Sequence, residues 1–159
     1  MATNIYINAD LTNANKGSAT KSGAGVVALA GTYAKTAADN DTSVIRFFKG
    51  VPSTYIPLIV TVACEALSGA TDVDMGVYKT DLGVVVDKDC LMDGQTLASA
   101  SLVLNGLGGL AAADRGKPLY LLAGETVASH QEQYDIALTG NTFGTATGNI
   151  GITAIFAQQ

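Results

Sequence analysis

The sequence predicts an all-β protein: a single β-sandwich of the jelly-roll type with an extended N-terminal arm. Apolar and polar side chains alternate along residues 56–78 on both sides of a Gly-containing turn, as in two strands that each cover a core with one face. The same alternation returns at 133–139 and 149–156. The connections are irregular in length and rich in Gly, Asn and Thr, which favours a jelly roll over a regular meander.

The composition fits one folded domain that has an assembly partner. A chain of 159 residues buries roughly 70% of its unfolded surface, so it needs no disulfide or metal to fold. A net charge of -5, with nine basic residues spread thinly, excludes a nucleic-acid footprint. Only 14% of residues are charged and 48% are hydrophobic, which indicates self-association or a partner protein. No signal peptide or membrane span is present, so we expect synthesis in a cytoplasm and no membrane contact.

The N-terminal part differs in composition from the rest. Residues 1–42 are rich in Asn, Thr, Ala, Gly, Ser and Lys, with a short strand candidate at 4–8 and an apolar patch at 26–29. This modest apolar content favours an arm that orders against a neighbour over a disordered tail. We therefore expect an arm at 1–42 and the β-sandwich at 43–159.

The first strand of the sandwich is predicted at residues 43–50, where Ile45 and Phe47 share one face. Pro52 and Pro57 then bracket a bend, because Pro is tolerated at strand starts and not in ladder interiors.

The central pair of strands is predicted to form a hairpin at the middle of the sandwich. One face of its first strand is apolar: Leu58, Val60, Val62, Cys64 and Ala66. After the turn at 68–71, Val73, Met75 and Val77 point inward while Asp72, Asp74 and Tyr78 point outward.

The later segments are mixed. Residues 79–101 predict a loop or short strand followed by a helical turn, and the Gly-rich stretch 102–114 predicts a mobile loop. Residues 117–122 predict a short buried strand or a turn of helix. Two strands end the chain, with inward side chains at Tyr134, Ile136 and Leu138 and then at Ile150, Ile152, Ala154 and Phe156.

An acidic cluster raises the question of a calcium site, because hard cations bind several carboxylate oxygens. Its members are Asp72, Asp74, Asp81, Asp87, Asp89 and Asp93. Their spacing fits no 12-residue calcium loop, so solvent-facing carboxylates are the preferred interpretation. Cys64 and Cys90 are expected to be reduced thiols.

No constellation of residues predicts catalysis. His130 is the single histidine and has no second ligand or nucleophile near it in the sequence. Glu65 and Glu125 are the candidate acid and base for glycoside chemistry, but nothing in their flanks distinguishes them. The glycine runs at 106–109 and 23–25 lack the context of a phosphate loop. We expect no enzyme, with no catalytic, cofactor-binding or metal-binding residues and no cofactor.

Three stretches together resemble the small β-sandwich decoration, or cement, proteins of tailed-bacteriophage capsids. Residues 43–94 resemble that class's strand, Pro bend, long strand and T-x-D-x-G turn followed by an Asp-rich segment. RGKPLYLLAG at 115–124 is similar to its KPLW-x-L-x-G element, and EQYDIALTGNTFGTATGNIGITAIFA at 132–157 is similar to its terminal hairpin.

The resemblance implies a structural protein of the virion that binds the outer coat lattice as a homotrimer at threefold or quasi-threefold sites. It implies the major capsid protein as partner, the capsid surface as location and no active-site residues. For contacts with the coat we favour the arm and the loop near Arg115 and Lys117. The alternative is a carbohydrate- or receptor-binding module of a fibre or tail, for which Tyr33, Tyr55, Tyr78 and Tyr120 are the residues to test.

Overall fold

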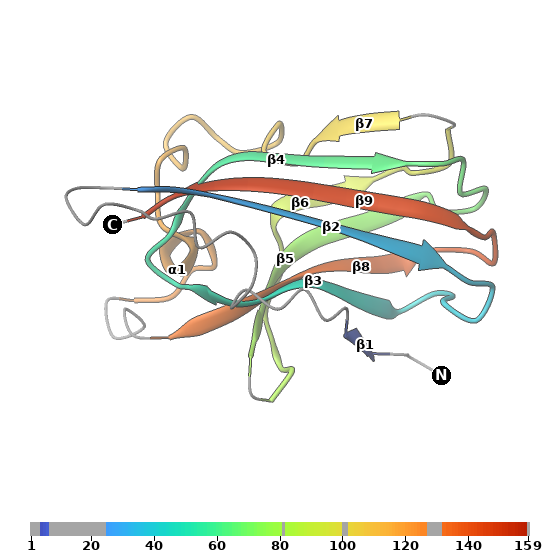
Figure 1. The fold of residues 1–159 in the computed structure, drawn as a ribbon, viewed down its shortest axis with the longest axis horizontal. Helices are drawn as coiled ribbons and strands as arrows, with labels where there is room; N and C mark the ends of the chain where they lie inside the picture. The colour runs from blue at the N-terminus through green and yellow to red at the C-terminus, as the bar shows by residue number, and fades with distance from the viewer. Residues whose placement is uncertain (1–3, 7–24, 81, 100–101, 127–131, 159) are drawn as a thin grey trace.

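Two β-sheets pack face to face in the computed structural model, which describes residues 4–6, 25–80, 82–99, 102–126 and 132–158 (Figure 1). The five-stranded sheet has the order β1-β3-β8-β5-β6, and the four-stranded sheet has the order β2-β9-β4-β7. The elements are β1 (Asn4–Tyr6), β2 (Val26–Lys35), β3 (Ser43–Pro52), β4 (Ile56–Cys64), β5 (Asp72–Lys79), β6 (Val85–Gln95), β7 (Leu102–Asn105), α1 (Leu119–Leu122), β8 (Gln133–Thr142) and β9 (Gly148–Ala157). The predicted all-β sandwich is confirmed.

The core lies between the sheets and contains most of the side chains that the alternation assigned to it. Val73, Met75 and Val77 of β5 are fully buried. The inward residues of β8 and β9 are at most 1% exposed: Tyr134, Ile136, Leu138, Ile150, Ile152, Ala154 and Phe156. Both cysteines are buried and free, as expected, and burial raises the pKa of each thiol.

The predicted central hairpin is wrong, because β4 and β5 lie in different sheets. Strand β4 pairs with β9 and β7, whereas β5 pairs with β8 and β6. The connection crosses the sandwich at its end: Leu67 and Ala70 are fully buried, and the Leu67 N–H donates to the Leu97 carbonyl at 3.0 Å. Alternation shows which face of a strand is buried, and it does not show which strand lies beside it.

Strand β4 also contains a bulge that the alternation did not predict. The register with β9 shifts between Pro57 and Ile59, so Leu58 is 48% exposed rather than inward. Beyond the strand, Ala66 is exposed and the neighbouring Leu67 is buried in its place.

The sandwich begins before residue 43. Strand β2 pairs with β9 residue by residue from Val26 to Lys35, a range that the sequence assigned to the arm. Leu29 points into the core. The Lys35 amine is buried and donates to the carbonyls of Gly144 and Ala146, at 3.0 and 2.8 Å. Both ends of β2 therefore belong to the folded body.

The segment 79–101 contains no helical turn within its described residues. It forms the long strand β6, which pairs with β5 through three register shifts. Because β6 is the edge of its sheet, its aspartates can face water, and this hid the strand pattern. The predicted loop at 102–114 begins with β7, and 117–122 does contain the predicted turn of helix.

Candidate functional site

Three carboxylates meet where β5 and β6 pair. Oxygens of Asp74, Asp89 and Asp93 lie within 4.8 Å of one another. Asp89 and Asp93 are exposed, as the sequence analysis expected, but Asp74 is only 1% exposed. The remaining members of the predicted acidic cluster are Asp72 and Asp87, which are half-buried, and Asp81, which lies outside the described residues.

The pKa values of two carboxyl groups in this cluster, Asp74 and Asp89, are shifted in opposite directions. Burial opposes ionisation of Asp74, but hydrogen bonds from the Gly94 N–H, Asn141 and Lys88 outweigh it and lower the pKa of that carboxyl. Asp89 has a pKa raised to about 6 by a hydrogen bond with Asp87, by burial and by the neighbouring negative charges. The cluster therefore holds one stable carboxylate and one group that titrates near neutral pH.

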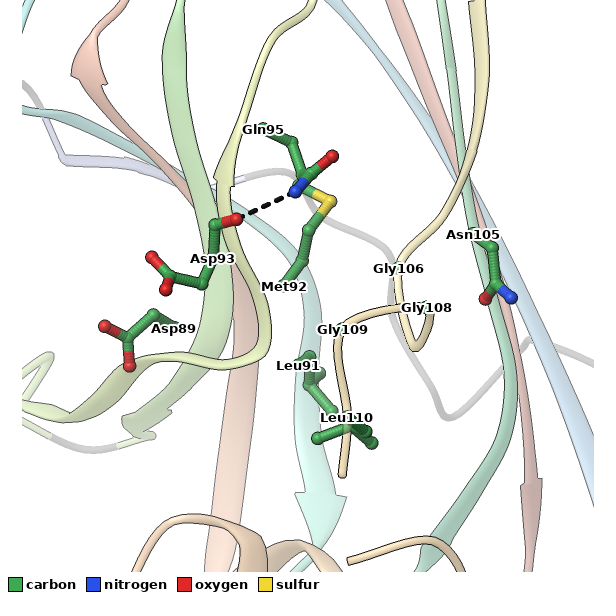
Figure 2. Close-up of a pocket in the computed structure, with 10 residues that line it drawn as sticks. All are labelled: Asp89, Leu91, Met92, Asp93, Gln95, Asn105, Gly106, Gly108, Gly109 and Leu110. Carbon is green, nitrogen blue, oxygen red and sulfur yellow. Dashed lines mark hydrogen bonds between the residues drawn. The ribbon is translucent and has the colours of Figure 1, made fainter. Parts of the chain in front are cut away.

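Beside Asp89 and Asp93 is a pocket of about 410 Å³ between β6 and the turn that follows β7 (Figure 2). Its lining is Asp89, Leu91, Met92, Asp93, Gln95, Asn105, Gly106, Gly108, Gly109 and Leu110. The two aspartates are the titratable groups of this lining, and no nucleophile or histidine accompanies them. The glycine run at 106–109, which lacks the context of a phosphate loop, thus forms one wall of this pocket. The pocket could not be predicted from the sequence, because its other wall is strand β6.

The candidate acid and base are far apart in the fold. Glu65 accepts a hydrogen bond from the Asn149 N–H at 2.8 Å, where β9 begins. Glu125 contacts Lys79 and accepts from the Tyr134 hydroxyl at 2.7 Å, where β8 begins, at the opposite end of the sandwich (Figure 1). The two cannot act on one substrate. The predicted candidate His130 lies outside the described residues.

Of the residues favoured for coat contacts, Arg115 and Lys117 belong to one loop, and residues 1–3 and 7–24 of the arm lie outside the described residues. Arg115 donates to the Leu107 carbonyl at 3.2 Å, and Lys117 forms a surface ion pair with Asp114 at 2.7 Å. Their role in a contact stays a prediction. Tyr78 and Tyr120, which were candidates for sugar stacking, are buried, and Tyr33 and Tyr55 are half-buried.

The outer surface of the four-stranded sheet is a feature that the sequence analysis missed. Its strands contain one charged residue, the buried Lys35. In the other sheet β3 contains two, β5 three, β6 four and β8 one, and of these Arg46, Asp74 and Asp135 are buried. We call the outward residues of its three long strands the uncharged face: Ala28, Ala30 and Thr32 of β2, Gly151, Thr153 and Ile155 of β9, and Ile59, Thr61 and Ala63 of β4. A charge-free surface on an acidic protein is a candidate for contact with another protein.

Two solved structures share this sandwich. A chain in the capsid of Ralstonia phage GP4 matches with a TM-score of 0.60 and 14% identity, over 85% of each chain. A chain in the capsid asymmetric unit of cyanophage Pam1 matches with a TM-score of 0.50 and 19% identity, over 86% of this chain and 87% of the other. No family model and no curated protein matches. At these identities the likeness establishes a common fold, of a class that occurs in phage capsids.

Among the described residues, no helix has the length and hydrophobicity needed to cross a membrane.

Proposed function

We propose that this chain is a structural protein of a bacteriophage virion that decorates the capsid and stabilises it by binding the outer coat lattice. The observation that carries the proposal is the match to chains from two phage capsids over 85% or more of both partners. Such coverage means that the likeness concerns the whole molecule rather than a shared pair of sheets.

The action of such a protein is mechanical. A rigid sandwich that contacts several coat subunits adds buried area where the subunits meet. Several weak contacts on one particle raise the effective affinity without any single strong site. We propose a homotrimer at threefold or quasi-threefold positions, with the major capsid protein as partner.

The alternative of a glycan-binding module receives less support. Stacking of sugar rings needs exposed aromatic faces, and the four tyrosines named for this role are buried or half-buried. We therefore retain the virion structural role as the proposed function.

The decisive measurement is the copy number of this protein relative to the major coat protein in purified particles, by quantitative mass spectrometry. A decoration protein is expected at a fixed ratio to the coat protein. If the uncharged face makes the contact, washing in high salt should leave the protein bound, because such a contact contains no charges for salt to screen. A few copies per particle would assign it to a vertex or tail instead. Absence from particles would refute the proposal.

A further inference from the structure

Three side chains from neighbouring strands meet on the side of the five-stranded sheet that faces away from the core. They are Asn141 of β8, Asp74 of β5 and Lys88 of β6, and β5 lies between the other two strands (Figure 1). The Lys88 Nζ donates to Asn141 Oδ1 at 2.8 Å and lies 3.0 Å from Asp74 Oδ2. The Asn141 Nδ2 donates to the same Asp74 oxygen at 2.6 Å. An amine, an amide and a buried carboxylate therefore form one closed set of contacts.

These contacts fix the orientation of the Asn141 amide. Its Nδ2 faces the carboxylates of Asp74 and Asp72, the second at 3.2 Å, and its Oδ1 faces the Lys88 ammonium group. A flipped amide would place its oxygen against both carboxylates, which is unfavourable. Since a C=O bond is about 1.2 Å long, the Lys88 Nζ lies no farther than about 4 Å from the amide carbon Cγ. A small rotation of the lysine chain reaches the distance of about 3–3.5 Å at which a nucleophile attacks.

The carboxyl group of Asp74 is placed to carry a proton between the two nitrogens. Its Oδ2 contacts both Lys88 Nζ and Asn141 Nδ2, and its Oδ1 is held by the Gly94 N–H at 2.9 Å. Asp74 is 1% exposed, so little water competes for these oxygens. One group that touches both the nucleophile and the leaving group can serve first as general base and then as general acid.

Other lysines have contacts of a different kind. Lys79 and Lys117 form ion pairs with carboxylates, which are poor electrophiles. The buried Lys35 donates to backbone carbonyls, where attack would cut the chain. Lys88 is the lysine whose described contacts include a side-chain amide, and that amide can release ammonia.

We propose that Lys88 and Asn141 form an isopeptide bond, with Asp74 as the proton carrier. The neutral amine of Lys88 attacks Cγ of Asn141, so the Nζ–Cγ bond forms, the Cγ–Nδ2 bond breaks and Nδ2 leaves as ammonia. Asp74 accepts one proton from Nζ and donates it to Nδ2, which regenerates the carboxylate. The reaction consumes no oxidant, reductant or other co-reactant.

The environment of the amine makes this reaction slow. The hydrogen bond with Asp74, together with the charges of Asp74, Asp89 and Asp72, raises the pKa of Lys88 against the opposing effect of burial. Tyr78 of β5 is the other titratable group near this amine. Because only the neutral amine attacks, the rate is expected to rise about tenfold per pH unit below the pKa of Lys88.

The bond would tie the edge strand β6 to β8 across β5. Strand β6 pairs with β5 through three register shifts and has no strand on its other side, so its own hydrogen bonds hold it irregularly. The two joined residues are 53 positions apart, and closing so long a loop constrains the unfolded chain. Cross-linked protein is therefore expected to melt roughly 10 °C higher than the same protein before the reaction.

Intact mass spectrometry of the purified protein during prolonged incubation tests the proposal. The wild type is expected to lose one molecule of ammonia, about 17 Da, from each chain. Cyclisation of an asparagine onto its own backbone releases the same mass. Tandem mass spectrometry after trypsin digestion is therefore needed to find the branched peptide in which Lys88 is uncleaved and joined to Asn141.

Three variants assign the roles of the three residues. Lys88→Arg keeps the positive charge beside Asp74 and lacks the nucleophilic amine, and Asn141→Ser lacks the amide, so neither is expected to give the branched peptide. Asp74→Asn keeps both reacting groups and is expected to slow the reaction at least about tenfold. Lys117→Arg is the matched control, because Lys117 is 42% exposed and Lys88 43% exposed, and both form ion pairs with aspartates. This control is expected to lose ammonia as the wild type does.

The purified protein is sufficient for this test, so the inference does not depend on the proposed function. A cross-linked protein that is absent from particles would refute the function and leave the isopeptide bond in place. A wild type that keeps its full mass would overturn the inference, as would a loss of ammonia that persists unchanged in K88R. If D74N fails to give the far-UV spectrum and cooperative unfolding of the wild type, K88R and N141S still decide whether the bond forms.

Discussion

Arg46 and Asp135 form the buried ion pair of the five-stranded sheet. Their side chains are 1% and 0% exposed and lie 3.2 Å apart. Asp135 also accepts hydrogen bonds from the Gly50 N–H and the Thr80 hydroxyl, and the guanidinium lies 4.8 Å from the centre of the Tyr78 ring. The ion pair and the contacts around it thus connect strands β3, β5 and β8 with the β5–β6 hairpin.

Asp135→Asn is expected to lower the free energy of unfolding by roughly 3–5 kcal/mol, because it leaves the Arg46 charge buried without its counter-ion. Urea unfolding followed by circular dichroism measures the change. The control is Asp114→Asn in the surface pair with Lys117, whose side chains are 39% and 42% exposed, where a loss below about 1 kcal/mol is expected. Equal losses in the two variants would contradict this account.

The carboxyl of Asp89 makes stability depend on pH near neutrality. Its pKa of about 6 in the folded protein lies above the value of about 3.9 for an unperturbed Asp. The fold therefore favours the protonated form of Asp89. The resulting contribution to the free energy of unfolding is complete below pH about 4 and is lost as the pH rises through 6.

We expect Asp89→Asn to raise the melting temperature at pH 7.5 and to leave it unchanged at pH 4, where the wild-type carboxyl is itself neutral. Thermal unfolding of both proteins across this range gives the difference. Asp74→Asn is the matched comparison with the opposite sign, since its lowered pKa stabilises the fold above pH about 4. If D89N changed the melting temperature equally at both pH values, the charge of Asp89 would not be the cause of the change.

At the scale of elements, the pairing of β5 with β6 depends on Gly76. A Cβ at this position would lie 2.1 Å from the Asp87 carbonyl oxygen and 2.5 Å from the Lys88 carbonyl carbon. Both atoms are backbone, so neither can rotate away. The register shifts on either side of Gly76 bring strands β5 and β6 this close together.

Gly76→Ala is therefore expected to destabilise the protein by about 1–3 kcal/mol or more, as overpacking does. Gly151→Ala is the control, because its Cβ would meet its nearest atoms at 3.5 Å or more. We expect that variant to be neutral or slightly stabilising, since Ala loses less conformational entropy than Gly on folding. Chemical denaturation distinguishes the two, and similar midpoints would refute the role assigned to Gly76.

The elements that the sequence predicted correctly are those in which large apolar side chains recur with the two-residue period. Strand β9 has one buried set of side chains, such as Ile150 and Ile152. Strand β8 is buried on both faces, and it was found because Tyr134, Ile136 and Leu138 alternate with smaller or polar residues. Strand β6 was predicted only as a loop or short strand followed by a helical turn, because its edge position and register shifts let aspartates interrupt the period. Strand β2 was missed because small Ala and Gly side chains give little contrast between faces.

The candidate surfaces were harder to predict than the strands. The uncharged face requires Thr32, Ala63 and Gly151 to lie side by side, and these residues come from three strands whose order cannot be deduced from the alternation. The absence of charge from 26–34, 56–64 and 148–157 could have been noticed beforehand.

For the molecule as a whole, the uneven distribution of charge agrees with a protein that has one face in water and one in contact. The strands of the four-stranded sheet expose no charged side chain, whereas those of the five-stranded sheet expose Lys49, Asp89 and Asp93. The remaining charges of the five-stranded sheet are buried or half-buried. A protein that binds a capsid from outside needs such a division, because one surface must replace water on the coat while another stays solvated.

The boundary of the N-terminal arm is the last point that can be tested at this scale. The sequence placed it at residue 42, but β2 pairs with β9 from Val26 onward. A chain that starts at Gly25 keeps this strand and loses β1, which pairs with β3 over only three residues. A chain that starts at Asp41 loses β2 together with the buried Leu29 and the two hydrogen bonds of Lys35.

We expect the chain that starts at Gly25 to unfold cooperatively within a few degrees of the full-length protein, and the chain that starts at Asp41 to be strongly destabilised or unfolded, because it exposes one side of β9 and the core beneath it. Differential scanning calorimetry separates these outcomes. If the arm contacts the coat, the Gly25 chain should also bind particles at least about tenfold more weakly, since each subunit loses one of its several contacts. Undiminished binding to particles would count against the arm alone and would leave the proposed role of the sandwich in place.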